Sequence, residues 1–295
     1  AFAVWIAISV VTGHRGAGQV LSAALSFGSF FVIVALGQMF VITLGPGNVD
    51  LSIAANMTLA GTVAMKLMAS NDSLLVFGLI AALACGIAIG CINYGLIRIL
   101  SIPPIIATLS SRFIFQSAAI WYNRGLRIKP PPLLSEFTNW KFMGIPVLAL
   151  SILVLTVIMH IVLTRTIYGR SVIAIGQNMR AAQLAGIATE STRFLTYVMC
   201  AVLASTCGFF LAGFSGGAAL NMGQEYLLAS IAVVVIGGTS VAGGFANVTG
   251  LWGAALFLFL VVSMLNTYGL GAGIRMVLTG LIIIGVITAA GGKKN

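Results

Sequence analysis

Long apolar stretches alternate with short polar connections along the whole chain. Most of them approach the 20 or so apolar residues that an α-helix needs to cross a bilayer. The first stretch is short and begins at Ala1 rather than Met, so we expect that the native start is missing, and no basic leader or cleavage site indicates a signal peptide. The pattern predicts an all-α integral membrane protein with about ten spans, at residues 1–12, 20–44, 51–69, 74–97, 104–121, 145–165, 191–212, 226–240, 247–268 and 274–290.

One polar and basic island interrupts the apolar pattern, over residues 169–187. A short helix is expected to start near Asn178, whose side chain can accept free backbone N–H groups, and Gly186 is suited to end it. Small side chains on one face of this helix would let the surface of a partner approach closely. By helical spacing that face carries Ala181, Leu184, Ala185 and Ala188. The island is therefore predicted to be a docking element.

Two distant parts of the chain are similar to each other. Residues 51–64 and 229–242 share Ser-Ile-Ala and then Gly-Thr, and residues 92–96 match residues 265–270 in the same order. On the ten-span count the matching spans are five apart, so they cross the bilayer in opposite directions. This predicts two inverted repeats, spans 2–5 and 7–10, an arrangement that commonly encloses a pathway near the midplane. Chance similarity between Ala- and Gly-rich helices is the alternative.

Composition excludes a soluble globular protein. Hydrophobic residues make up 60% of the chain and charged residues 7%, against about 25% charged residues in soluble domains. The net charge of +10 comes from 15 basic and 5 acidic residues. These charges are scattered between apolar stretches rather than gathered on a groove, so membrane lipid and an acidic partner are expected and nucleic acid is not. The cysteines lie in apolar stretches, where they pack as small residues, and no metal site is predicted.

Six polar residues within or beside the spans are candidates for a helix break or a pathway: Asn48, Asp50, Ser52, Asn56, Asn93 and Asn266. Asp50 follows a break at residues 45–48, whose proline and two glycines cannot continue a regular helix. Either the first four of these residues line a pathway, or Asp50 caps the next helix, and we favour the cap. For Asn93 and Asn266, which occupy corresponding places in the two repeats, interhelical amide bonding of about 0.6 to 2 kcal/mol is the default and lining a pore is the alternative.

Four motifs in a fixed order carry a resemblance to a known family. They are residues 45–52 (GPGNVDLS), residues 102–109 (IPPIIATL), the polar island, and residues 231–244 (IAVVVIGGTSVAGG). They are similar, in the same order, to motifs of the permease subunits of ATP-binding-cassette (ABC) sugar importers of the ribose-transport type. The first motif departs from the family pattern, because Pro46 and Asn48 stand where Gly-Gly-Ile is usual.

The resemblance implies a single transmembrane permease domain over residues 1–295, of the type II-like ABC importer class. It places a coupling loop at about residues 169–190 in the cytoplasm. We take the orientation from the resemblance, because Lys and Arg are evenly divided between the two sides of the membrane. The residues that it assigns to coupling with an ATPase are Gly176, Gln177, Asn178, Arg180, Ala181, Ala182, Leu184 and Gly186.

The resemblance further implies that the chain imports a monosaccharide, a pentose or a hexose, across the bacterial cytoplasmic membrane. ATP and Mg²⁺ would be bound by a partner ATPase, because this chain has neither a phosphate-binding loop nor a catalytic constellation. The expected partners are that ATPase, a second permease copy or paralogue, and a periplasmic sugar-binding protein. Import of nucleosides or of a sugar-derived signalling molecule is the alternative. An ion-coupled secondary transporter is less favoured, because Asp50 and Arg112 are the whole supply of embedded ionisable residues.

Overall fold

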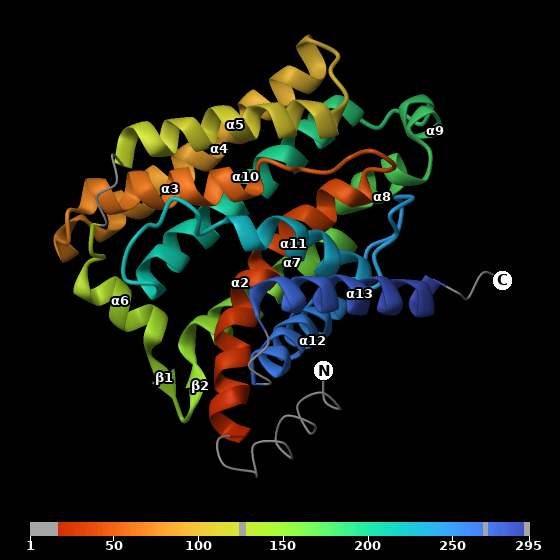
Figure 1. Cartoon of the computed structure of the whole chain (residues 1–295). Helices are drawn as coiled ribbons and strands as arrows, with labels where there is room; N and C mark the ends of the chain where they lie inside the picture. The colour runs from red at the N-terminus through yellow and green to blue at the C-terminus, as the bar shows by residue number, and fades with distance from the viewer. Residues whose placement is uncertain (1–16, 124–127, 268–270, 292–295) are drawn as a thin grey trace.

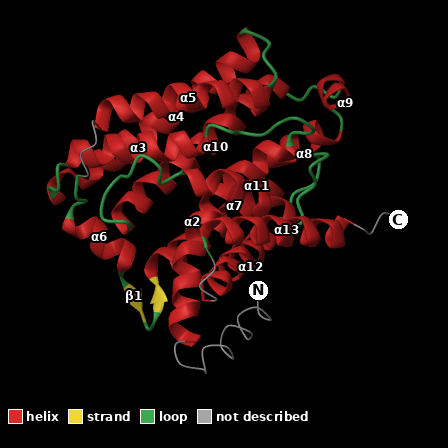
Figure 2. Ribbon diagram, in the orientation of Figure 1, coloured by secondary structure: helices red, strands yellow, loops and turns green. Residues whose placement is uncertain are grey.

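The computed structural model describes residues 17–123, 128–267 and 271–291, and these residues are almost entirely helical (Figures 1 and 2). The strands in this part of the chain are two short ones, β1 (Lys141–Phe142) and β2 (Ile145–Pro146), paired antiparallel with Lys141 opposite Pro146. The all-α prediction is confirmed. The helices are α2 (Ala17–Thr43), α3 (Ile53–Met68), η1 (Asp72–Leu74), α4 (Leu75–Ile99), α5 (Pro104–Asn123), α6 (Pro132–Asn139), α7 (Val147–Arg165), α8 (Ile167–Gln177), α9 (Met179–Leu184), α10 (Thr189–Phe214), α11 (Gln224–Ile236), α12 (Val248–Thr267) and α13 (Ala272–Gly291).

Each predicted span from residues 20–44 onwards corresponds to a helix, and the predicted span at 1–12 lies outside the described residues. Among the described helices, α2, α4, α7, α10 and α12 are long and apolar enough to cross a membrane. The apolar helices α3 and α11 are shorter, with 16 and 13 residues. These two short helices occupy corresponding positions in the two repeats.

The short helices α3 and α11 meet at their N-terminal ends. A Cβ atom on Gly223, the residue before α11, would overlap the carbonyl oxygen of Ala54 in the first turn of α3. From this meeting point, α3 runs towards α6 and α11 runs towards α8. At 1.5 Å per residue they are about 24 and 20 Å long, so together they match the 40–45 Å or so of a whole bilayer.

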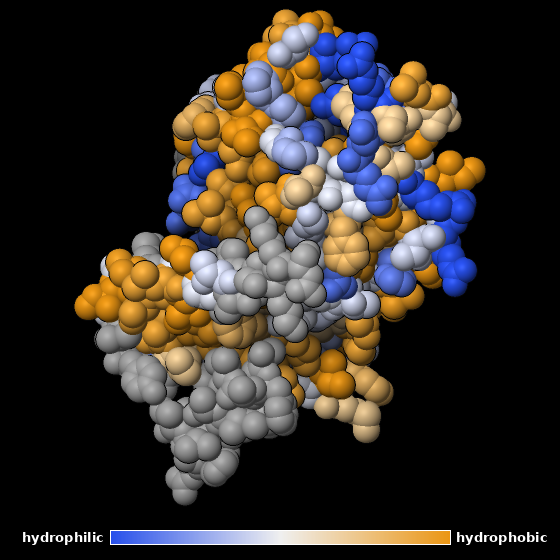
Figure 3. Space-filling view, turned by 90° about the vertical axis from the view of Figure 1, so that its right-hand side faces the viewer, coloured by the Kyte–Doolittle hydropathy of each residue, from blue (hydrophilic) through white to orange (hydrophobic). Residues whose placement is uncertain are grey.

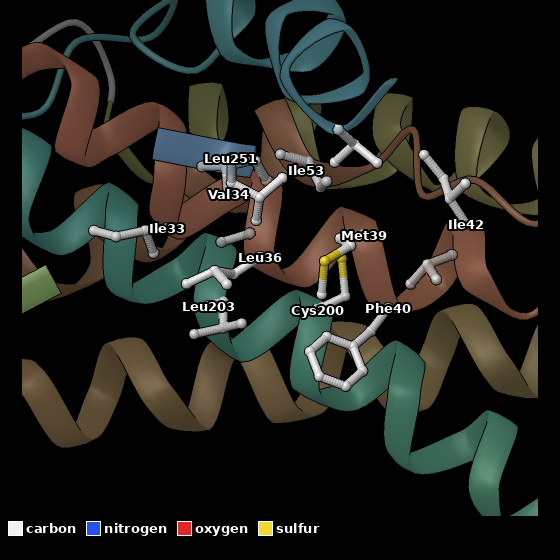
Figure 4. Packing of buried hydrophobic residues seen from close by; sticks show 14 of the residues in the cluster. Ile33, Val34, Leu36, Met39, Phe40, Ile42, Ile53, Cys200, Leu203 and Leu251 are labelled. Carbon is white, nitrogen blue, oxygen red and sulfur yellow. The ribbon is translucent and has the colours of Figure 1, made fainter. Parts of the chain in front are cut away.

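The first helices of the two repeats, α2 and α10, cross at a glycine. A Cβ atom on Gly37 would lie 2.9 Å from the Cα atom of Cys200, so the two backbones are in close contact. Beyond the crossing, α2 packs against α11 and α12, and α10 packs against α3 and α4. Each first helix thus packs against the next two helices of the other repeat, as expected of inverted repeats. Figure 4 shows part of the resulting core, including Phe40 on α2 and Leu203 on α10.

The molecule has two distinct ends, which we name by their helices (Figure 1). The α9 end contains α8, α9 and the loops at residues 44–52 and 237–247. The α6 end contains η1, α6 and the β1–β2 hairpin. No long apolar stretch lies between the predicted spans at residues 104–121 and 145–165, and the structure shows that α6 and β1 form there. Pro132 begins α6, a position where its missing N–H costs nothing.

Figure 3 looks onto the α9 end, where polar side chains gather with apolar ones around them, and the long helices between the two ends carry many exposed apolar side chains. The exposed large apolar side chains of α7 are Leu150, Leu153, Val154, Val157, Ile158 and Ile161. On a soluble protein an apolar area of this size marks a hidden interface. On a chain of apolar helices long enough to cross a bilayer, it is the surface that contacts lipid. The protein is therefore a multi-pass membrane protein.

Candidate functional site

The polar island folds into α8 and α9, which are joined at Asn178 (Figure 1). The side-chain oxygen of Asn178 accepts the backbone N–H of Ala181 at 3.0 Å. Gly186 has a φ of 81°, and the N–H groups of Gly186 and Ile187 donate to the carbonyl groups of Gln183 and Ala182, both at 3.0 Å. These two hydrogen bonds define a Schellman end. The helix start and the helix end expected from the sequence are both present.

The outer surface of α9 is open to a partner. Leu184 is 86% exposed, an unusual position for a large apolar side chain outside a membrane span. Arg180, Ala181, Gln183 and Ala185 are also exposed. Ala182 is only 5% exposed and packs into the main core. In this conformation Ala182 therefore anchors α9 to the body of the protein, although the sequence grouped it with the docking residues.

A set of polar contacts joins α9 to the start of α10 and the end of α4. The amide of Gln183 donates to the hydroxyl of Thr189 at 3.2 Å. The next residue, Glu190, has one carboxylate oxygen 2.7 Å from the Nε atom of Arg98, and the same oxygen accepts the hydroxyl of Tyr94 at 2.7 Å. The Arg98 and Glu190 side chains are 63% and 41% exposed, so the ion pair contributes little to stability. Its effect is to fix the end of α4 beside the start of α10.

The anchor of α8 is a partly buried, uncharged side chain. The Tyr168 ring stacks on Phe40 of α2, with ring centroids 6.1 Å apart. Its hydroxyl lies 2.8 Å from the hydroxyl of Thr196 on α10. Burial raises the pKa of the Tyr168 phenol, so this residue remains neutral at physiological pH. A rigid neutral contact of this kind holds the polar island against α2 and α10.

A buried hydrogen-bond chain contains three of the predicted pathway residues. One oxygen of Asp50 accepts both the backbone N–H and the hydroxyl of Ser52, at 2.8 and 2.6 Å. The amide of Asn93 donates to the Ser52 hydroxyl at 2.7 Å, and the Ser111 hydroxyl donates to the Asn93 oxygen at 2.6 Å. All four side chains are fully buried. These hydrogen bonds link the 44–52 loop to α4 and α5, and in this conformation the four side chains line no open pathway.

Asp50 lies at the start of α3, where a cap is expected. It accepts the N–H of Ser52, the residue immediately before α3, while the Ser52 side chain itself caps nothing. The second carboxylate oxygen of Asp50 has no hydrogen-bond partner among the described groups. A carboxylate at the N-terminus of a helix is stabilised by the helix dipole. Among the described groups Asp50 accepts no N–H of α3 itself, so the capping interpretation of Asp50 stays a prediction.

The other predicted pathway residues lie in different surroundings. Asn48 accepts the hydroxyl of Tyr197 on α10 at 3.2 Å, and Asn56 donates to the carbonyl group of Ala201 at 2.7 Å. Asn266 lies near the end of α12 and is exposed. The two asparagines that match in sequence, Asn93 and Asn266, are therefore not equivalent in burial.

The sequence did not predict the residues that bond to the 44–52 loop and to Asn93. Thr108 accepts the backbone N–H of Leu51 at 3.0 Å, and Ser111 and Tyr197 complete the contacts. Thr108 was within reach of the sequence, because it belongs to the IPPIIATL motif. Tyr197 lies 149 residues from Asn48, so no local pattern joins the two. Over the residues that the structure describes, no group of three His, Cys, Asp or Glu side chains could hold a metal ion.

The chain matches a known family over residues 20–287, which is most of its length. The family is described as the branched-chain amino acid transport system / permease component. The chain belongs to this permease family. No solved structure matches the permease at a significant level.

Several curated proteins are similar to the permease over most of their length. A probable ABC transporter permease protein, y4mJ, of Sinorhizobium fredii is 29% identical over 95% of this chain and 86% of its own. The ribose import permease protein RbsC of Bacillus subtilis is 30% identical over 85% of this chain and 78% of its own. The autoinducer 2 import system permease protein LsrC of an Enterobacter species is 28% identical over 92% and 79%. These relatives identify an ABC importer permease, as the resemblance predicted.

Proposed function

We propose that this ABC permease moves a monosaccharide, a pentose or a hexose, across the cytoplasmic membrane of a bacterium, driven by a separate ATPase subunit. The observation that carries the proposal is the exposed surface of α9. Burial of Ala182 in the core and the hydrogen bond from Gln183 to Thr189 connect this helix to the body of the protein. The ATPase binds ATP and Mg²⁺ and docks on α9 in the cytoplasm. Its closure displaces α9, and the displacement moves α10 and the loops around the buried chain. In this proposal α9, α10 and these loops have two arrangements, and nucleotide binding to the ATPase shifts the equilibrium between them.

A sugar-binding protein delivers the cargo at the α6 end, which faces the periplasm. A surface hollow of about 600 Å³ there is lined by Leu133, Glu136, Phe137, Asn139 and Trp140. Two exposed apolar side chains and one carboxylate suit a partner surface that combines apolar and polar groups. Delivery by a separate protein means that the permease itself needs only weak contacts with the sugar.

A second copy of the permease, or a close paralogue, completes the path. Arg112 lies in the middle of α5, is half-buried, and forms no ion pair with a described residue. A charged group at such a depth faces water or protein rather than lipid, because lipid exposure costs several kcal/mol. The α5 face that carries Arg112 therefore faces the path between two permease subunits.

The choice of a sugar rests on relatives. RbsC is named a ribose import permease, and FruF of Bifidobacterium longum, 27% identical over 95% of this chain, a fructose import permease. The second candidate cargo is a sugar-derived signalling molecule, because LsrC is named an autoinducer 2 import permease. A thermal-shift screen of the binding protein encoded beside the permease separates them: stabilisation by a pentose or hexose alone supports the proposal, and stabilisation by autoinducer 2 alone contradicts it.

The docking role of α9 is tested by Leu184→Glu. Leu184 is 86% exposed, so a carboxylate there leaves the fold intact but must be desolvated when an ATPase covers it. A loss of about 2 kcal/mol, or roughly thirtyfold in affinity, is expected. The matched control is Leu133→Glu, at a 54% exposed leucine of the α6 end, which should retain the ATPase. The measurement is co-purification of the ATPase with each permease variant, and equal retention by both variants would contradict docking at α9.

Asp50→Asn tests the assignment of Asp50. The asparagine oxygen can still accept the N–H of Ser52, so this bond at the start of α3 remains while the charge is lost. Uptake of labelled sugar by reconstituted complex is expected to stay within about threefold of wild type, a change of less than 1 kcal/mol. Abolished uptake in a fully assembled complex would instead assign Asp50 to a charged pathway.

A further inference from the structure

Three backbone segments meet at glycines beside the end of α8. Gly176 lies in the last turn of α8, and a Cβ atom on it would overlap both the carbonyl oxygen of Thr43 and the backbone nitrogen of Gly244. Thr43 is the last residue of α2, and Gly244 belongs to the loop between α11 and α12. On the far side, a Cβ atom on Gly243 would lie 2.7 Å from the backbone nitrogen of Gly45. We name this contact of Gly45, Gly176, Gly243 and Gly244 the glycine junction.

A hydrogen bond closes the glycine junction. The N–H of Gly244 donates to the carbonyl group of Thr43 at 3.0 Å, so the end of α2 is satisfied by the α11–α12 loop. Gly45, Gly243 and Gly244 have φ angles of 115°, 86° and 73°, in the left-handed region that favours glycine. Both loops therefore need glycine for their own turns, and the 237–247 loop also needs it for its close approach to α8 and to Gly45.

The glycine junction connects α9 with both inverted repeats. The 44–52 loop leads from Gly45 to α3, and the 237–247 loop leads back from Gly244 to α11. These are the two short helices that meet at Gly223. Gly176 is separated from α9 only by Gln177 and Asn178. A displacement of α9 thus reaches α3 and α11 by short backbone routes, in addition to its contacts with α10.

We propose that the glycine junction is the positioning site through which α9 moves α3 and α11 together, and that Gly176 is its central residue. The inference rests on the proposed function, because it assumes that an ATPase displaces α9. Backbone atoms in direct contact cannot rotate aside as a side chain can. A densely packed contact of this kind transmits a displacement with little loss.

Gly176→Ala tests the proposal. The new methyl group pushes α8 away from Thr43 and Gly244, so the motion of α9 no longer reaches the two loops. The matched control is Gly95→Ala on α4, because Gly95 is also helical but has no atom within 4 Å of the Cβ position. In reconstituted complexes, Gly176→Ala is expected to retain the ATPase and its ATP hydrolysis while uptake per ATP falls at least tenfold. Gly95→Ala should match wild type. Normal uptake per ATP in Gly176→Ala would overturn the proposal.

A measurement on the unmodified complex keeps the proposal testable if Gly176→Ala does not assemble. The N–H of Gly244 donates to the carbonyl group of Thr43 at 3.0 Å, so hydrogen–deuterium exchange of this amide reports whether the junction is closed. If the junction stays closed throughout transport, the Gly244 amide remains equally protected with and without ATP. Loss of that protection during ATP-driven uptake would show that the junction must open, and would overturn the proposal.

The two levels of proposal fail in different ways. Wild-type complexes that show no ATP-dependent uptake of any candidate solute would contradict the proposed function. The junction is judged only by the difference between variant and wild type in complexes that transport. Any solute that the wild-type complex moves is sufficient for that comparison.

Discussion

Replacing Asn93 by leucine removes the amide at the centre of the buried hydrogen-bond chain while nearly keeping the branched shape of the side chain. Asn93 is fully buried on α4 and bonds Ser52 at 2.7 Å and Ser111 at 2.6 Å. The hydroxyl of Ser52 keeps its bond to Asp50, and that of Ser111 keeps its bond to the carbonyl group of Thr108. No hydroxyl is left entirely without a partner, so the loss is limited to the two bonds themselves.

The expected loss of stability follows from these two bonds. A side-chain hydrogen bond between helices in a bilayer contributes about 0.6 to 2 kcal/mol. Two such bonds amount to about 1 to 4 kcal/mol, and we expect a value in the lower half of that range because both serines remain partly satisfied. The free energy of unfolding of Asn93→Leu should therefore fall by about 1 to 2 kcal/mol.

A double-mutant cycle isolates the bond between Asn93 and Ser111. The free energy of unfolding in mixed micelles is measured for wild type, Asn93→Leu, Ser111→Ala and the double variant. The coupling energy should lie between about 0.6 and 2 kcal/mol. A coupling of zero within error, or a fully stable Asn93→Leu, would refute the claim that this bond holds α4 against α5.

Further predictions concern helix packing and the surface ion pair. Gly90→Ala on α4 places a Cβ atom within 2.5 Å of the backbone of Val198, so it should lower the free energy of unfolding by about 1 to 3 kcal/mol, whereas Gly95→Ala should be neutral or stabilise slightly. Thermal unfolding of the purified permease checks both variants. Arg98→Gln removes one side of a largely exposed ion pair, so we expect a change of less than about 1 kcal/mol that shrinks in high salt. A larger loss, or one that salt does not affect, would mean that the pair acts as a buried contact.

The sequence predicted most helices because apolar length alone distinguishes a span from a connection in a membrane protein. It also predicted the start and end of α9, since Asn178 and Gly186 act on their own backbone neighbours. It did not predict α6, because an 8-residue amphipathic helix in a Pro-rich segment has no long apolar signal. Helix starts and ends could be predicted where the residues that set them bond to neighbours within a few positions of the sequence.

The parts of the site that the sequence did not predict depend on distant partners. Ala182 looks like any other small residue on the exposed face of α9, and only the packing of α9 against the body shows that it is buried. Asn93 and Asn266 match in sequence, yet one is buried in a network and the other is exposed. The packing of the two repeats against each other decides which side chains meet. The order of residues along the sequence does not contain this information.

The meeting of α3 and α11 at Ala54 and Gly223 has a consequence for how this protein can change shape. A continuous helix that bends in a bilayer must break backbone hydrogen bonds where no water can replace them, at several kcal/mol for each. Two short helices that meet at their N-terminal ends can instead shift relative to each other with every internal backbone hydrogen bond intact. The contact at Ala54 and Gly223 therefore divides the membrane-spanning length into two halves that can move separately without local unfolding.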